Sequence, residues 1–183
     1  MTRDKYIIRL ARRDELSLLN EVEQAAAALF REVGFDFAAE IGPLSLKLLQ
    51  SLQSKGQIWV AAGHDGLPVG FAVVQIIDGL AHLEEISVHP AHGRQGLGRR
   101  LIRVVCDWAR DERYPAVTLS TFRDVPWNAP FYERLGFRVL GKEEIGPGLL
   151  AVREHEARDG LAVRERVCMR IELRGSIAST FDP

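Results

Sequence analysis

Apolar and polar residues follow two periods along this chain, and each change of period marks a new element. Apolar residues that alternate with polar ones, or that form short runs, predict strands. Strands are expected at residues 6–10, 58–62, 69–77, 81–88, 116–121, 137–140 and 166–173. Apolar residues that recur every three or four positions predict helices. Helices are expected at residues 14–32, 43–52, 97–110, 128–135 and 149–158.

Capping residues set the expected ends of the first two helices. Asp14 is placed to cap the first helix, and Gly34 is placed to stop it. The segment Phe35-Asp36-Phe37 reads as a loop with two exposed aromatic residues. Pro43 fits the first turn of the second helix, because proline has no N–H that the helix would leave unpaired.

Two turns join consecutive strands into an antiparallel meander. His64-Asp65-Gly66 and Asp78-Gly79 carry the Asp-Gly signal of tight hairpin turns. No repeat, linker or low-complexity tract interrupts the pattern. We therefore predict one mixed α/β domain over residues 1–183, with its core at about residues 6–173 and a loose tail at 174–183.

The stretch from Ala81 to Arg110 combines a strand, a glycine-rich turn and an amphipathic helix. Glycine permits a positive φ and lets the backbone approach a ligand closely. Free N–H groups at a helix start, together with the positive end of the helix dipole, favour an anion. Arginines also crowd the first helical turns, at positions 94, 99, 100 and 103. The stretch predicts an anion site, or else a solvated basic helix start behind a flexible loop.

Two common nucleotide motifs are absent from this turn. A phosphate-binding P-loop ends in Gly-Lys-Ser/Thr, which the turn lacks. The dinucleotide fingerprint is Gly-x-Gly-x-x-Gly, whereas the order in this turn is Gly93-x-x-Gly96-x-Gly98. Neither a nucleoside triphosphatase nor a nicotinamide-dependent dehydrogenase is favoured.

The composition is that of an ordinary globular protein, and the net charge limits the classes of partner that are expected. Of 183 residues, 46% are hydrophobic, and the formal net charge is −1, so no overall field favours nucleic acid or a membrane surface. Cys106 and Cys168 are isolated, as expected for small buried residues in a reducing compartment. The charged start of the chain does not read as a signal peptide. We expect a cytoplasmic protein without a transmembrane span.

Two short segments resemble the GNAT family of N-acetyltransferases. Val88-His89-Pro90, followed by Gly96-Leu97-Gly98 at the start of a helix, is similar to that family's acetyl-CoA signature. Phe131 to Phe137, with the sequence FYERLGF, resembles its second signature, Phe-Tyr-x-x-x-Gly-Phe. There are two departures, because Gly93 replaces the usual Arg or Gln and Val125 replaces the usual Asn.

The resemblance implies a fold and a cofactor. The fold is a central mixed, mostly antiparallel twisted sheet flanked by helices and splayed at the acetyl-CoA site. Strand backbone then pairs with the pantetheine arm, and the glycine loop holds the pyrophosphate mainly through its amides. The implied cofactor-binding residues are Ile86, Ser87, Val88, Gly93, Arg94, Gln95, Gly96, Leu97, Gly98, Arg99 and Asn128. For Asn128 the favoured interpretation is that it caps the short helix instead.

Acetyl transfer to an amine calls for a base and benefits from an acid. Glu84 matches the position of a family glutamate that acts as base, and His82 is the second choice. Glu85 takes the role if a bulge shifts the strand register. A solvated acidic pair on a sheet face is the alternative. Tyr132 matches the family tyrosine that protonates the leaving thiolate, or else it is a core residue.

The resemblance implies that the acetyl acceptor is a primary amine on a small molecule or a peptide. The identity of this acceptor stays open. Phe30, Phe35 and Phe37 form an apolar wall for it or belong to the core, and Asp36 or Glu40 is placed to attract a cation. The rival function is an acetyl-CoA sensor without turnover. No metal is expected, because His89 and His92 lack a third ligand. A monomer or a homodimer fits equally.

Overall fold

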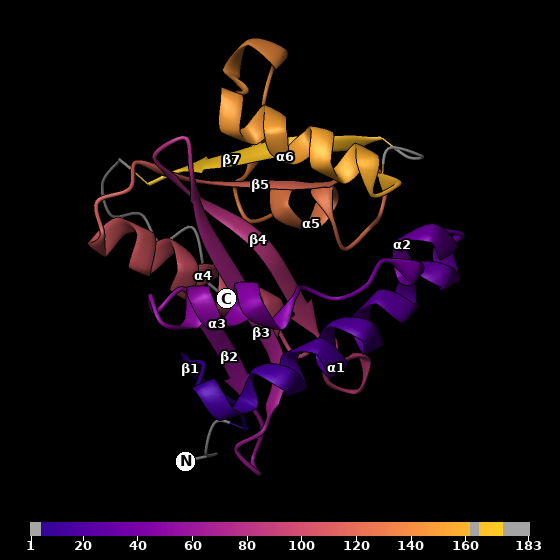
Figure 1. Cartoon of the computed structure of the whole chain (residues 1–183), viewed down its shortest axis with the longest axis vertical. Helices are drawn as coiled ribbons and strands as arrows, with labels where there is room; N and C mark the ends of the chain where they lie inside the picture. The colour runs from indigo at the N-terminus through magenta and orange to yellow at the C-terminus, as the bar shows by residue number, and fades with distance from the viewer. Residues whose placement is uncertain (1–4, 162–164, 174–183) are drawn as a thin grey trace. The chain divides into compact units, whose positions relative to one another are not determined.

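The computed structural model describes residues 5–161 and 165–173 and confirms a mixed α/β fold with a mostly antiparallel sheet flanked by helices (Figure 1). The strands are β1 (Ile7–Leu10), β2 (Ile58–Ala62), β3 (Pro68–Ile77), β4 (Leu80–Val88), β5 (Ala116–Phe122), β6 (Arg138–Val139) and β7 (Arg166–Glu172). The helices are α1 (Leu16–Ala27), α2 (Asp36–Glu40), α3 (Leu46–Gln53), α4 (Leu97–Asp111), α5 (Ala129–Glu133) and α6 (Pro147–Arg158). No helix in the described ranges is long and apolar enough to cross a membrane.

The strand order in the sheet is β1-β2-β3-β4-β5-β7-β6. β1 with β2, β2 with β3, β5 with β7 and β6 with β7 are antiparallel pairs. β4 pairs with β5 in parallel, from Ala81 opposite Val117 to Leu83 opposite Leu119. By compactness the chain divides into a first unit, residues up to 75 with 84–105, and a second unit, residues 76–83 with those from 106. β3, β4 and α4 contribute residues to both units.

The first unit has a core of apolar side chains, most of them aliphatic, from α1, α3, β2 and β3. Its fully buried members include Leu19, Leu49, Val60 and Phe71. Burying one such side chain contributes about 1.5–3 kcal/mol. Those α1 and α3 residues lie on the apolar faces that the helical period predicts, so packing on these strands holds both helices in place.

The first predicted helix is broken into three parts, which corrects the expected span. A 3-10 turn at Arg13–Glu15 precedes α1, and a second one at Ala28–Val33 follows it. Asp14 lies inside the first turn and does not cap the helix. Glu15 binds the Arg12 N–H and the Arg9 guanidinium instead. Gly34, with a φ of 74°, ends the second turn as predicted, because glycine adopts this left-handed conformation without strain.

The segment between α1 and α3 is more ordered than the predicted loop. Phe35 is 8% exposed and precedes α2, so the expectation of two exposed aromatics in a loop is wrong. Its ring packs on Phe30 and Phe37, with centroids 6.4 and 5.5 Å away. Helix α3 begins after Ser45, whose hydroxyl accepts the Leu48 N–H, so the helix does not start at Pro43. Serine satisfies a terminal N–H, which proline cannot do.

The second unit has α6 packed along β5 and β7 (Figure 1). The Asp78-Gly79 turn has φ angles of 52° and 73°, as the hairpin signal predicts. The Asp78 carboxylate also accepts the N–H groups of Gly148 and Leu149 at the start of α6. A negative charge there is favourable, because the helix dipole is positive at its N-terminus. Asp78 therefore fixes both the turn and the helix.

Candidate functional site

The glycine turn of the first unit connects β4 to α4 through a short 3-10 turn at Pro90–His92. Gly96 has a φ of 72°, and Arg94 has a φ of 56°, whereas Gly93 is extended. A non-glycine residue in the left-handed region costs about 1 kcal/mol or more and is typical of functional loops. Gly98 is already helical. Of the three glycines that permit this conformation, only Gly96 adopts it.

The amides of this turn are available to a ligand. Residues 94–96 are exposed, and the amides of 94–97 donate no hydrogen bond to the described part of the chain. The Arg100 N–H donates to the Gly96 carbonyl at 3.1 Å and so begins the α4 ladder. Arg94 and Arg99 have exposed side chains at the same end. This arrangement of free amides, a helix start and cations suits a phosphate.

Close backbone packing fixes the end of β4, where Ile86, Ser87 and Val88 were predicted to pair with a cofactor. Gly70 on β3 faces it, and a Cβ at Gly70 would lie 3.1 Å from the Ser87 carbonyl oxygen and 3.1 Å from Cγ2 of Val88. The His89 N–H donates to the Val69 carbonyl at 2.8 Å. The absence of a side chain at Gly70 therefore allows the two strands to approach at this point.

Three acidic residues interact electrostatically in the first unit. The Ser87 hydroxyl donates to Glu85 at 2.8 Å. Glu23, on α1, accepts the Leu44 N–H on its two carboxylate oxygens at 3.2 and 3.1 Å. The pKa of Glu23 is raised to about 8, mainly by burial and also by the charges of Glu85 and Glu84, while the hydrogen bond from Leu44 acts in the opposite direction. A strongly perturbed carboxyl is typical of functional sites.

Glu23 was not among the site residues predicted from the sequence, although one signal in the sequence pointed to it. Glu23 follows Leu19 by four residues and so shares the buried face of α1. A carboxylate on an apolar face needs a partner or a function, because burying an unpaired charge is costly.

His82, the second choice for the base, lies in the core of the second unit. It is 2% exposed, and its Nδ1 is 3.0 Å from Oγ1 of Thr118. Burial lowers its pKa to about 4 against the opposing charges of Glu156 and Asp78. The imidazole is therefore neutral at physiological pH and has little access to water. These properties describe a structural histidine better than a base that exchanges protons.

Tyr132 and Asn128 belong to the short helix α5. Tyr132 is 7% exposed, with its ring edge-on to Phe131 and Phe137 at 5.4 and 5.7 Å between centroids. Asn128 occupies the N-cap position of α5, as the favoured interpretation has it, but its side chain makes no capping hydrogen bond. Its backbone carbonyl accepts the N–H groups of Phe131 and Tyr132 instead. Val125, at the family's Asn position, is 1% exposed and packs as an apolar residue.

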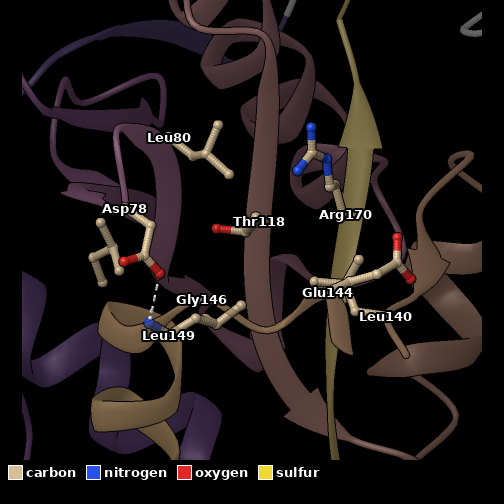
Figure 2. Close-up of a pocket in the computed structure, with 9 residues that line it drawn as sticks. Asp78, Leu80, Thr118, Leu140, Glu144, Gly146, Leu149 and Arg170 are labelled. Carbon is tan, nitrogen blue, oxygen red and sulfur yellow. Dashed lines mark hydrogen bonds between the residues drawn. The ribbon is translucent and has the colours of Figure 1, made fainter. Parts of the chain in front are cut away.

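A cavity of about 210 Å³ lies elsewhere in the second unit, beside the start of α6 (Figure 2). Thr118 and Arg170, which are paired across β5 and β7, project into it (Figure 2). Asp78 and Glu144 also line it, and their charges are met by the α6 amides and by Arg138. None of its lining residues is a predicted site residue. Among the described residues, no group of three His, Cys, Asp or Glu side chains is placed to hold a metal.

Comparison with known proteins points to one family. The sequence profile described as "Acetyltransferase (GNAT) family" matches residues 21–137. Glucosamine 6-phosphate N-acetyltransferase of Trypanosoma brucei brucei is 36% identical over 59 residues, which cover 32% of this chain and 38% of that protein. S-(2-succino)cysteine N-acetyltransferase of Bacillus subtilis (strain 168) is 32% identical over 76 residues, which cover 40% of this chain and 46% of that protein.

The chain therefore spans less than half the length of these two relatives. Among solved structures, the PaiA N-acetyltransferase of Thermoplasma acidophilum in complex with coenzyme A aligns with a TM-score of 0.65 at 18% identity. The alignment covers 91% of this chain and 98% of that chain, and it shows a shared fold.

Proposed function

Because the chain belongs to the acetyltransferase (GNAT) family, we propose that it is an acetyl-CoA-dependent N-acetyltransferase that moves the acetyl group directly to a primary amine. The observation that carries this proposal is the turn from Gly93 to Leu97. The amides of residues 94–97 donate no hydrogen bond to the described part of the chain, and Arg94 and Gly96 are left-handed, between the Pro90–His92 turn that follows β4 and the start of α4. This geometry suits the pyrophosphate of coenzyme A.

The cofactor is expected to lie along the end of β4. The register of β4 with β5 ends at Leu83, ahead of Ile86, Ser87 and Val88. These three residues are proposed to pair with the pantetheine amides, and an N–H near Val88 is proposed to polarise the acetyl carbonyl.

The phosphate end of the site is completed by Arg94, Gln95, Gly98 and Arg99. Asn128 is retained as a candidate contact for the pantetheine arm, since its side chain does not cap α5.

Glu84 is the proposed general base. Through a water molecule it removes a proton from the acceptor amine, whose nitrogen then attacks the carbonyl carbon of the thioester. Glu85 is less suited, because the bond from the Ser87 hydroxyl stabilises its ionised form. The burial of His82 makes it less suited still.

Tyr132 is the proposed general acid. When the tetrahedral intermediate collapses, the carbon–sulfur bond breaks and the thiolate takes the phenolic proton, which leaves free coenzyme A. The nitrogen gives up its extra proton to water to form the neutral amide, and water returns a proton to the phenolate. An ordinary phenol keeps its proton at neutral pH and therefore has one to donate.

A cationic amine is the acceptor that the first unit favours. The charges of Glu85 and Glu84 add to burial in raising the free energy of ionising Glu23, as its raised pKa records. A bound ammonium group relieves this repulsion, whereas an anionic acceptor increases it. Polyamines and the amino termini of peptides have this charge.

The test is a thiol-release assay with acetyl-CoA and a panel of polyamines, amino acids and peptides. For an amine that is turned over, Glu84→Gln is expected to lower kcat by roughly 10²–10⁴-fold. Tyr132→Phe is expected to lower it by a smaller factor. Glu85→Gln is the matched control and is expected to keep most of kcat, although the KM for a cationic amine is expected to rise because one negative charge is lost. If Glu84→Gln turns over at the parent rate, the assignment of the base is wrong.

If the parent protein binds acetyl-CoA but releases no thiol with any amine, the sensor function is supported instead. In that case the variants would also release no thiol, and their comparison would not test the assignment of the base. For this reason the parent protein is screened against the whole amine panel before any variant is made.

A further inference from the structure

Tyr6 contacts the glycine loop of the first unit on both sides. Its hydroxyl is 2.9 Å from Nδ1 of His92, the residue immediately before Gly93. Its backbone carbonyl accepts a hydrogen bond of 3.0 Å from Nη2 of Arg100, in the first turn of α4. The Tyr6 and His92 rings also meet edge to face, with centroids 5.7 Å apart and planes at 83°. One residue therefore links the entry and the exit of the loop.

Tyr6 is itself held firmly. It is 4% exposed and directly precedes β1, which pairs with β2 from Ile7 opposite Ala62 to Leu10 opposite Trp59. The loop that it contacts is exposed at residues 94–96 and holds Arg94 at a φ of 56°. A loop in a left-handed conformation persists only where its surroundings fix it. The buried tyrosine supplies a fixed point next to an exposed and strained segment.

We propose that Tyr6 is a positioning residue for acetyl-CoA, which it serves by holding His92 and Arg100 so that the loop between them keeps its binding conformation. The proposal rests on the proposed function, in which this loop receives the pyrophosphate. Tyr6 acts through His92 and the loop amides, and no step of the chemistry is assigned to it. Its loss should therefore weaken cofactor binding and leave the chemical step unchanged.

The experiment measures the dissociation constant of coenzyme A by calorimetry and the kinetic constants of each variant. Tyr6→Phe removes the hydroxyl and keeps the ring, and His92→Ala removes its partner. Each is expected to raise Kd and the KM for acetyl-CoA by about three- to tenfold, as the loss of one net hydrogen bond predicts. Their kcat is expected to stay within about twofold of the parent value, since positioning and chemistry are separate.

Three further variants make the test specific. The double variant Tyr6→Phe/His92→Ala is expected to have the same Kd for coenzyme A as the single variant with the higher Kd, because both changes break the same contact. His92→Asn offers a polar atom near the position of Nδ1 and is expected to restore binding. Tyr114→Phe removes the hydroxyl of a half-buried tyrosine that packs on Trp108, and it is expected to bind like the parent.

The outcomes separate this inference from the proposed function. If the parent binds coenzyme A and Tyr6→Phe binds it equally well, the positioning role is wrong and the proposed function stands. If the two single effects multiply in the double variant, Tyr6 and His92 act independently and the inference is again wrong. If the parent does not bind coenzyme A, the proposed function fails, and the role of Tyr6 fails with it.

Discussion

The Glu23 carboxylate on α1 accepts the Leu44 N–H on its two oxygens, at 3.2 and 3.1 Å. This contact fastens the segment before α3 onto α1. The same carboxyl is held near the charges of Glu84 and Glu85, and its pKa is raised to about 8. Glu23 thus links a structural contact to the proposed acceptor region.

The raised pKa of Glu23 predicts how stability changes with pH. The native state keeps a proton on this group up to about pH 8, whereas the unfolded chain loses it near pH 4.5. The contribution of Glu23 to the free energy of unfolding is therefore fully present below pH 4.5 and is lost as the pH rises toward 8. Between these values, the free energy of unfolding is expected to fall by up to about 1.4 kcal/mol per pH unit. Urea unfolding at several pH values measures this slope.

Glu23→Gln removes the titrating group. It is expected to flatten the change of unfolding free energy with pH between about pH 5 and pH 8, the range between the unfolded and native pKa of Glu23. Glu21→Gln, on the exposed side of the same helix, is the control and should keep the parent slope. Equal slopes for the parent and Glu23→Gln would show that Glu23 titrates near its ordinary pKa.

Gly70 predicts a second effect, on the end of β4. In Gly70→Ala the new methyl group would meet the Ser87 carbonyl oxygen and Val88 Cγ2 at 3.1 Å. The end of β4 must give way by a few tenths of an ångström, which is expected to cost about 1–3 kcal/mol of stability and to weaken coenzyme A binding. Gly42→Ala is the control, because a methyl group at that position would have no atom within 4 Å beyond its chain neighbours. Parent stability and affinity in Gly70→Ala would contradict the tight packing.

The ion network beneath α6 predicts a third effect. Glu156, whose side chain is 14% exposed, binds Arg166 and Arg153 and the Ser120 hydroxyl, each at 2.8 Å. Glu156→Gln leaves both guanidinium groups without their counter-charge and is expected to cost about 2–4 kcal/mol of unfolding free energy. Thermal and urea unfolding measure it.

The control for this network is Asp107→Asn, which breaks the exposed ion pair with Arg110 on α4. An exposed pair contributes less than about 1 kcal/mol, so this variant should unfold nearly like the parent. If Glu156→Gln lowered the free energy of unfolding no more than Asp107→Asn, the network beneath α6 would stabilise the fold no more than an exposed ion pair.

Local signals in the sequence predicted most of the architecture. The turn at Asp78-Gly79 depends on two adjacent left-handed residues and the turn at Asp65-Gly66 on a left-handed Gly66, and the Asp-Gly pairs in the sequence indicate both turns. The buried face of α4, with Leu97, Leu101 and Val105, follows from helical spacing alone. Features of this kind need no knowledge of distant neighbours.

The missed features depend on contacts between distant parts of the chain. The pKa of Glu23 is raised by burial and by the charges of Glu85 and Glu84 on β4, and no local pattern brings these residues together. The link from Tyr6 to His92 spans 86 positions. Tertiary contacts decided both of these cases. Asp14 was a reasonable cap by residue type, but Glu15, which pairs with the nearby Arg9, occupies the N-cap position of α1.

The most direct test of the central claim is a calorimetric titration of the protein with acetyl-CoA, repeated with coenzyme A that lacks its 3′-phosphate. The account predicts a micromolar Kd for acetyl-CoA, about −8 kcal/mol, and weaker binding of the truncated cofactor if arginines at the loop contact that phosphate. The absence of binding at millimolar acetyl-CoA would contradict the account, and the glycine turn would then be a purely structural connection.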